Sequence, residues 1–283
     1  MGAPGDRLRR RGLARLGVAT DAHLSARQQA WDWLLRHPVQ NMRWKGYFED
    51  VAPDVRNANR EQYTPGEVAR YLMRNSTADP AVELHVPALL GWIRDTLGDP
   101  DAKWRGATGI REQFYYLQLS SSHTARYGSL NAMWAARGGA AFAEEGRRAL
   151  ALASYFARDD GVVIFSLCDQ SVWFSDGYFD YVPHFLDAMA ALPELAPPDQ
   201  DHILGSTSVL TEVAYADGRV EYVAAHADGT EVLRLTFAPG TVLADGVPLP
   251  PGAGSFGAGY EFEAAGGVLR VTRTAASRVV VAR

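Results

Sequence analysis

The spacing of apolar residues changes once along this chain of 283 residues, and the change restricts the folds that it can adopt. In the first part, apolar side chains recur every three or four positions, which is the pattern of helices with one buried face. From about Ser206 onward they alternate with polar residues, which is typical of strands. The prolines and acids of PELAPPDQD separate the two patterns. The sequence therefore predicts an α+β protein, with a helical domain over 1–200 and a small antiparallel β-sandwich over 206–283.

Pairs of turn-forming residues divide the second part into short strands. Asp217-Gly218, Asp228-Gly229 and Gly266-Gly267 each stand between runs of alternating residues. Asp-Gly readily adopts the positive φ angles of two-residue turns, so the two Asp-Gly pairs are expected to connect antiparallel neighbours as β-hairpins. At least two more strands are expected around Gly266-Gly267.

Charge and composition exclude several classes of protein. The net charge of -5 gives no general attraction to nucleic acid or to an anionic membrane. No apolar run approaches the roughly 18 residues that span a bilayer, and Arg15 interrupts the N-terminal segment too early for an export signal. A cytoplasmic protein is therefore expected. Cys168 is the one cysteine, so it is read as a packing residue, and the absence of phosphate-binding loops and paired cysteines predicts neither cofactor nor metal.

The stretch from Thr108 to Trp134 carries an unusual set of polar residues. A helix opened by Ser121 or Ser122 is expected there, and His123, Arg126 and Tyr127 then share one face. Next to Arg126 the imidazole of His123 should stay neutral, which suits a general base. Arg126 can hold a carboxylate with two hydrogen bonds, and Glu112 and Gln113 stand just upstream. The alternative is a buried structural network in which Arg126 pairs with Glu112.

A second segment, RWKGYFED, combines aromatic and acidic residues. The rings of Trp44 and Tyr47 could stack on the apolar faces of sugar rings, and Asp50 could act as an acid or a base. The other interpretation is an aromatic core with its acids facing solvent. The sequence leaves both open.

A third segment, WFSDGYFDYVPHF, repeats this combination. Trp173, Asp176 and Asp180 could line a substrate site, with either acid taking part in proton transfer. Asp180 and His184 are one helical turn apart, which is also the spacing of a pair of metal ligands, but no third group completes such a site. Asp176-Gly177 could equally be an ordinary turn.

Helix pairs that carry segments such as WKGYFED and SHTARY, followed by a β domain, resemble α/α-toroid carbohydrate-active enzymes. The ending TVLADGVPLP…GYEFEAAGGVLRVTR also looks like the small β modules that close many glycan-degrading enzymes. The resemblance implies a catalytic helical barrel and a carbohydrate substrate. A complete toroid has more helices than the seven or eight that this sequence indicates, so a partial toroid, or one whose N-terminal pairs are absent from this chain, is expected.

A glycoside hydrolase that acts on an oligo- or polysaccharide is the expected function. Hydrolysis needs two carboxyl groups roughly 5 to 10 Å apart across the scissile bond. The predicted catalytic residues are Glu112, His123, Tyr127, Asp50 and Asp176. The predicted substrate-binding residues are Trp44, Tyr47, Gln113, Arg126, Trp173 and Asp180.

Two other functions remain open. A polysaccharide lyase would use His123 or Tyr127 as the base that removes a proton beside a uronate carboxylate, with Arg126 or Gln113 neutralising the charge that develops. The third hypothesis is a non-catalytic glycan-binding protein, or a truncated and inactive toroid.

Overall fold

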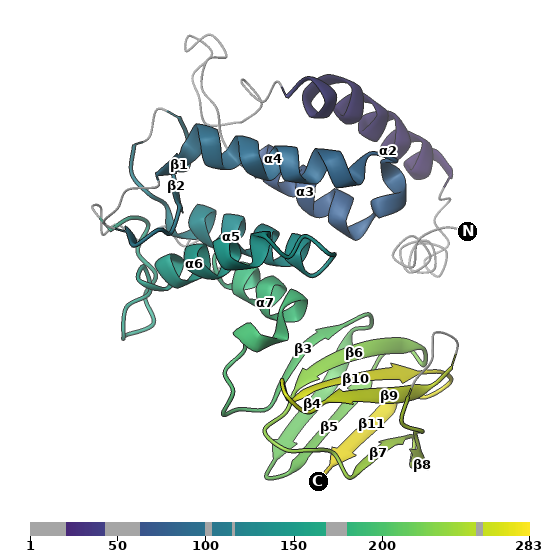
Figure 1. The fold of residues 1–283 in the computed structure, drawn as a ribbon. Coiled ribbons are helices and arrows are strands. Elements are labelled where there is room, and N and C mark those ends of the chain that lie inside the picture. Colours follow the sequence, from purple (N-terminus) through teal and green to yellow (C-terminus); the bar gives the residue numbers. More distant parts are fainter. Residues whose placement is uncertain (1–20, 43–62, 100–103, 115–116, 168–179, 253–256) are drawn as a thin grey trace. The chain divides into compact units, whose positions relative to one another are not determined.

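A computed structural model describes residues 21–42, 63–99, 104–114, 117–167, 180–252 and 257–283 (Figure 1). The chain divides into two compact units, Met1–Phe185 and Leu186–Arg283. The first is called the helical unit here and the second the β unit, and each is described by itself. Within the described residues, no helix is both long enough and apolar enough to cross a membrane.

Helices make up most of the described part of the helical unit, and one more runs across the division between the units. The α-helices are α2 (Asp21–Leu34), α3 (Tyr63–Arg74), α4 (Val82–Leu97), α5 (Ser121–Ala135), α6 (Phe142–Ser154) and α7 (Val182–Ala191). Short helical turns are η1 (Leu35–Val39), η3 (Ser76–Ala78) and η6 (Pro193–Leu195), and strands β1 (Gly98–Asp99) and β2 (Gly109–Ile110) form a small ladder. Helix α2 continues as the π-helical turn η1, in which Pro38 lacks the amide that a regular α-helical turn needs.

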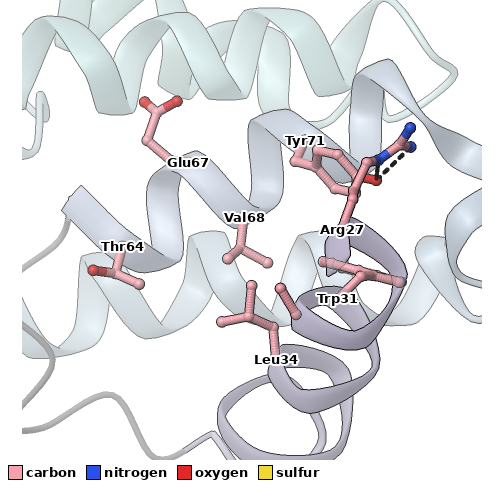
Figure 2. A pocket seen from close by; sticks show the side chains of 8 residues that line it. Arg27, Trp31, Leu34, Thr64, Glu67, Val68 and Tyr71 are labelled. Carbon is pink, nitrogen blue, oxygen red and sulfur yellow. Dashed lines mark hydrogen bonds between the residues drawn. The ribbon is translucent and has the colours of Figure 1, made fainter. Parts of the chain in front are cut away.

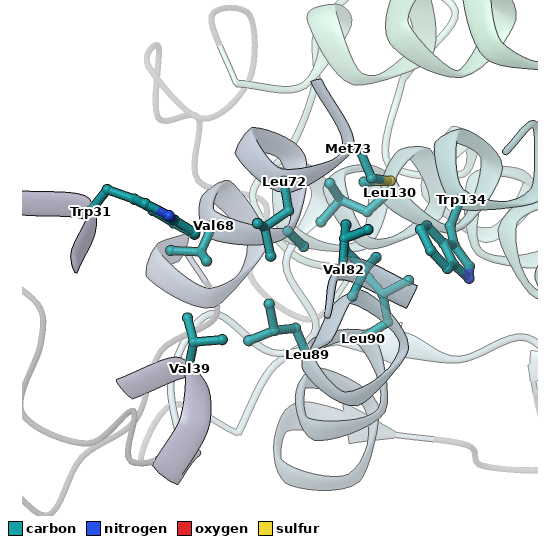
Figure 3. Close-up of a cluster of buried hydrophobic side chains, with 12 residues drawn as sticks. Trp31, Val39, Val68, Leu72, Met73, Val82, Leu89, Leu90, Leu130 and Trp134 are labelled. Carbon is teal, nitrogen blue, oxygen red and sulfur yellow. The ribbon is translucent and has the colours of Figure 1, made fainter. Parts of the chain in front are cut away.

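The main hydrophobic core of the helical unit joins helices α2 to α5 (Figure 3). Each helix contributes apolar residues at steps of three and four, which form a stripe along one face. Short helices are stable mainly because such a stripe is buried against neighbouring helices. The fully or almost fully buried members include Trp31, Val68, Leu72, Leu89, Leu90, Leu130 and Trp134.

Helix α5 is the central helix of this unit, because all of its residues except Met133 and Ala135 are buried. On one side it packs against α6 through glycines. A Cβ atom at Gly128 would lie 2.7 Å from the Leu150 side chain, and one at Gly146 would lie 3.0 Å from the backbone of Gly128. The two backbones therefore approach closely, and every polar side chain on α5 has to find its partners inside the protein.

The β unit consists of two antiparallel sheets. The strands are β3 (His202–Ser206), β4 (Leu210–Ala216), β5 (Arg219–Ala224), β6 (Gly229–Arg234), β7 (Thr241–Ala244), β8 (Val247–Pro248), β9 (Gly259–Glu263), β10 (Val268–Arg273) and β11 (Arg278–Ala282). One sheet has the order β3-β6-β10-β9 and the other β4-β5-β11-β7-β8. Both sheets contribute to one core that includes Val220, Tyr222, Leu233, Leu269, Val271, Val279 and Val281. Two sheets that share a core in this way form a β-sandwich.

One of the two predicted hairpins is confirmed, and so are the strands predicted around Gly266-Gly267. Asp217-Gly218 connects β4 to β5, and the Gly266-Gly267 region connects β9 to β10. The prediction for Asp228-Gly229 is wrong, because β5 and β6 belong to different sheets. Asp228 accepts a hydrogen bond from the amide of Ala275, and a Cβ at Gly229 would lie 2.6 Å from the guanidinium of Arg273. A glycine is therefore needed at position 229 because the buried side chain of Arg273 leaves no room for a Cβ atom there.

Candidate functional site

Three helices bring six charged or imidazole side chains together inside the helical unit. Two come from α3 and two from α5, and the members of each of these pairs are three residues apart, so they share a helix face. The other two, four residues apart, come from the turn before α7 and from α7 itself. This polar cluster consists of Glu67, Arg70, His123, Arg126, Asp180 and His184.

Arg126 is the centre of the polar cluster. Its side chain is 0% exposed, one of its terminal nitrogens donates to both carboxylate oxygens of Asp180, and its Nε lies 3.5 Å from Oε1 of Glu67. Arg70 lies 3.3 Å from the same oxygen of Glu67. A buried cation is tolerated only with such partners, because its desolvation costs several kcal/mol. The structure thus shows Arg126 engaged with Asp180 and Glu67, whereas the sequence suggested Glu112 as its partner.

The two carboxylates lie at the accessible side of the polar cluster. The side chain of Glu67 is 38% exposed and that of Asp180 is 26% exposed, whereas Arg126 has no exposure. Burial by itself would raise the pKa of Asp180, but the hydrogen bond with His184 and the charge of Arg126 outweigh it and lower that pKa to about 2. Asp180 is therefore an ionised carboxylate at neutral pH.

Both histidines of the polar cluster are neutral at neutral pH. Burial and the positive charge of Arg126 lower the pKa of His123 to about 3. Burial also lowers the pKa of His184, although Asp180 opposes the shift. Since Arg70 donates to Nδ1 of His184 at 2.9 Å, the proton of this imidazole is on Nε2, which lies 3.3 Å from Asp180.

Ser120 orients the imidazole of His123. It occupies the N-cap position of α5, and its hydroxyl lies 2.8 Å from Nδ1 of His123 instead of capping a backbone amide. Ser122 lies 3.1 Å from the same nitrogen. The prediction that Ser121 or Ser122 caps the helix is therefore wrong. The competing partner is the buried imidazole, which needs a hydrogen bond as much as the helix end does.

Tyr127 belongs to a different part of the interior. Its ring packs in a small core with Ile93, Leu97, Ile110 and Ala149, and its hydroxyl donates to Glu145 of α6 at 3.2 Å. Burial and the nearby carboxylate raise the pKa of Tyr127 well above its usual value. This phenol keeps its proton at neutral pH, which does not suit the predicted role as a base.

The remaining predicted site residues fall into two groups. Glu112 and Gln113 are half-buried between β2 and α5, and the amide of Gln113 lies 3.5 Å from the carboxylate of Glu112. The others lie outside the described residues, so their roles stay predictions: Trp44, Tyr47, Asp50, Trp173, Asp176 and also Cys168.

A pocket of about 380 Å³ lies between α2 and α3, next to the polar cluster (Figure 2). Its lining is mostly apolar, with an arginine that donates to a tyrosine hydroxyl at 2.8 Å. The carboxylate of Glu67 points away from Val68 and Leu34 in Figure 2, so its stem borders the pocket while its oxygens reach Arg126. The lining residues are Arg27, Ala30, Trp31, Leu34, Thr64, Glu67, Val68 and Tyr71.

Sequence reasoning missed Glu67 and Arg70 as members of the site. In the folded protein Arg70 is only 6% exposed, although it is two residues from Val68 and from Leu72 and so lies on the other face of α3 from them. A charged residue at a core position of an amphipathic helix indicates a buried partner. The partner itself is 114 residues away, at His184, and helical periodicity does not identify it.

Acid is expected to destabilise the helical unit, because the unfolded chain binds protons that the folded chain excludes. His123 has a pKa of about 3 when folded and about 6.5 when unfolded, and the pKa of His184 is also lowered by folding. As the pH falls from about 6.5 toward 3, His123 lowers the free energy of unfolding by up to about 1.4 kcal/mol per pH unit. His184 adds a loss in the same direction, because folding lowers its pKa as well. Asp180, with its pKa of about 2, adds a further loss below about pH 4.

Urea denaturation at a series of pH values measures this slope. His123→Asn should flatten it, whereas the same change at the exposed His23 should leave it as in the wild type. An unchanged slope in His123→Asn would contradict burial of a neutral imidazole at this position.

Comparison with protein-family models, curated proteins and solved structures found no match to this chain. Among the described residues, no group of three or more His, Cys, Asp or Glu side chains is arranged to hold a metal ion. The polar cluster and the pocket beside it are therefore the observations from which a function can be inferred.

Proposed function

We propose that this protein is a carbohydrate-active enzyme that hydrolyses glycosidic bonds, with Asp180 and Glu67 as its two carboxyl groups. The observation that carries the proposal is that one buried guanidinium, that of Arg126, contacts both. Because a guanidinium is small and rigid, their nearest oxygens are within about 8 Å of each other. Paired carboxyl groups catalyse glycoside hydrolysis at separations of roughly 5 to 10 Å.

The environments of the two groups suggest different roles. Asp180 is ionised at neutral pH, so it serves as the nucleophile or as the base that activates water. Glu67 borders the pocket and is the more exposed of the two, so it serves as the second carboxyl group of the pair. Arg126 acts as a positioning residue, because its rigid fork fixes the two carboxylates relative to each other.

The pocket supplies a place for a sugar ring next to Glu67. Its volume of about 380 Å³ lies within the range of small-molecule sites, which is roughly 300 to 1,000 Å³. Trp31 and Tyr71 contribute aromatic surface to its wall, and Arg27 contributes a donor group. Sugar rings have apolar C–H faces and polar edges, so a wall of this composition suits them.

Elimination is supported less well than hydrolysis. A lyase needs a base of suitable strength, but Tyr127 keeps its proton, and His123 with its pKa of about 3 is a weak base. A lyase also needs a cation for the substrate carboxylate, whereas Arg126 contacts two carboxylates of the protein itself.

The toroid-like fold is part of the same proposal. Helices α3 and α4 pack against each other as consecutive neighbours, and so do α5 and α6. Such helix pairs are the repeating unit of an α/α toroid, and an antiparallel β-sandwich follows them in this chain. These features support a partial toroid.

The proposal is tested with Asp180→Asn and Glu67→Gln. Each keeps the shape of the side chain and removes its charge and proton chemistry, so kcat/KM should fall about 100-fold or more. The probes are chromogenic aryl glycosides and a panel of oligosaccharides that includes uronates, and release of reducing ends is measured. Glu83→Gln, at an exposed position of α4, is the matched control and should retain full activity.

Three results would contradict hydrolysis at this site. The first is a wild-type protein that cleaves none of the probes. The second is an unsaturated product that absorbs in the ultraviolet, which indicates elimination. The third is turnover that survives in both variants, which would indicate that the polar cluster only stabilises the packing of the helices.

A further inference from the structure

A hollow of about 600 Å³ lies entirely within the β unit. It is formed by the segment before β3, the end of β4 and the turn that leads into β5. Its lining consists of Gln200, Asp201, His202, Tyr215, Ala216 and Asp217. It shares no residue with the polar cluster or with the pocket between α2 and α3.

Tyr215 gives this hollow an aromatic surface. It pairs across the sheet with Val220, whose side chain is fully buried, and paired residues in an antiparallel sheet share a face. Tyr215 is nevertheless 52% exposed, although it is on the core-facing side of the edge strand β4. Its hydroxyl accepts a hydrogen bond from the amide of Ile203 at 3.1 Å, which connects the ring to the opposite sheet. An aromatic ring is thus presented to solvent in a fixed position.

Acceptor groups surround the ring. Asp217 lies in the β4–β5 turn, where Gly218 has a φ of +63°, and Gln200 and Asp201 precede β3. The carboxylate of Asp201 is held in place by the amide and the hydroxyl of Thr236, at 2.7 and 3.0 Å. The hollow therefore combines one aromatic surface with several oxygen acceptors.

We propose that this hollow binds one sugar residue of a glycan. The apolar face of the sugar ring stacks on Tyr215, and its hydroxyl groups donate to Asp217, Asp201 and Gln200. A cationic ligand fits less well, because recognition of cations uses cages of several aromatic rings and this hollow has one. The site does not depend on hydrolysis in the helical unit, and it would hold a glycan to the protein whether or not a bond is cut.

Calorimetric titration of the full chain tests the proposal, with Asp180→Asn as the background so that no probe is cleaved. The probes are soluble hexasaccharides of glucose, mannose and galacturonate, with choline as the cationic alternative. One of the sugars should bind, and Tyr215→Ala should weaken it about tenfold or more, whereas Tyr215→Phe should keep most of the affinity. Val213→Ala is the matched control, because Val213 is exposed on the same strand but does not line the hollow.

The outcomes separate the proposals. Absence of binding by every sugar, equal affinity in Tyr215→Ala, or preference for choline would overturn the sugar site. If Tyr215→Ala does not fold, Asp217→Ala takes its place, with the same loss expected. If Asp180→Asn loses turnover but still binds the sugar as tightly as the wild type does, the result supports both sites independently.

Discussion

Replacement of Arg126 by leucine is expected to lower the free energy of unfolding of the helical unit by about 3 to 5 kcal/mol. The guanidinium is fully buried and contacts Asp180 and Glu67 on two other parts of the chain. Removal of one partner from a buried ion pair leaves the other charge without compensation, which costs more than the pair contributes as a whole. Leucine also fills less of the space that the arginine side chain occupies.

Tryptophan fluorescence during urea denaturation measures this effect, because all seven tryptophans precede the β unit. The matched control is Arg158→Leu, which removes an arginine whose ion pair with Asp160 is exposed and should cost less than about 1 kcal/mol. The double variant Arg126→Leu/Asp180→Leu should recover part of the loss, since two apolar groups replace two charges. A loss in Arg126→Leu no larger than in Arg158→Leu would contradict the central position given to Arg126.

Replacement of Glu231 by leucine is expected to destabilise the β unit by a similar amount, about 3 to 5 kcal/mol. Glu231 and Arg273 are both 0% exposed and form two parallel hydrogen bonds of 2.8 Å. Ser206 and Tyr222 each donate to Glu231 at 3.1 Å, and Arg273 also donates to two backbone carbonyls. Loss of the carboxylate therefore leaves several buried donors without their acceptor.

Circular dichroism of the strands follows unfolding of the β unit, and tryptophan fluorescence follows unfolding of the helical unit. Comparison of the two signals separates the two transitions. The control is Arg270→Met, at an exposed position of β10, the strand that carries Arg273, and it should cost less than about 1 kcal/mol. Glu231→Leu/Arg273→Met should be more stable than Glu231→Leu alone. If the single variant unfolds like the control, the buried network contributes little to the sandwich.

Much of the fold could be predicted from local patterns. The change of apolar period near Ser206 separates the helices from the sandwich strands, and Asp217-Gly218 was correctly read as a hairpin. The other Asp-Gly pair, Asp228-Gly229, does not form a hairpin, because a turn sequence specifies a reversal of the chain but not which sheet receives the next strand. Strand β6 pairs with β3 and β10, and the buried pair of Glu231 and Arg273 in this sheet joins residues 42 positions apart, so the pairing is a tertiary property.

The candidate site was predicted in part. His123 and Arg126 are predicted because polar groups seldom occupy a helix face that should be apolar, and Asp180 because it lies in a segment rich in aromatic and acidic residues. The three do meet in one cluster. Tyr127 was grouped with them because it shares their face of the helix, but it contacts α6 through Glu145. Glu67 is not among the residues that the sequence predicts for the site, since nothing in its neighbourhood along the chain indicates Arg126 as a partner.

By itself the sequence determined the order of helices and strands and the presence of buried charge in the stretch around Arg126. Both follow from interactions over a few residues, since periodicity and the burial of polar groups are properties of single elements. Only the tertiary structure decided which charges meet: Arg126 with Asp180, 54 residues away, and Arg70 with His184, 114 residues away. Such partners are fixed by how helices pack, because a buried charge must pair with whatever opposite charge the packed neighbours bring within reach.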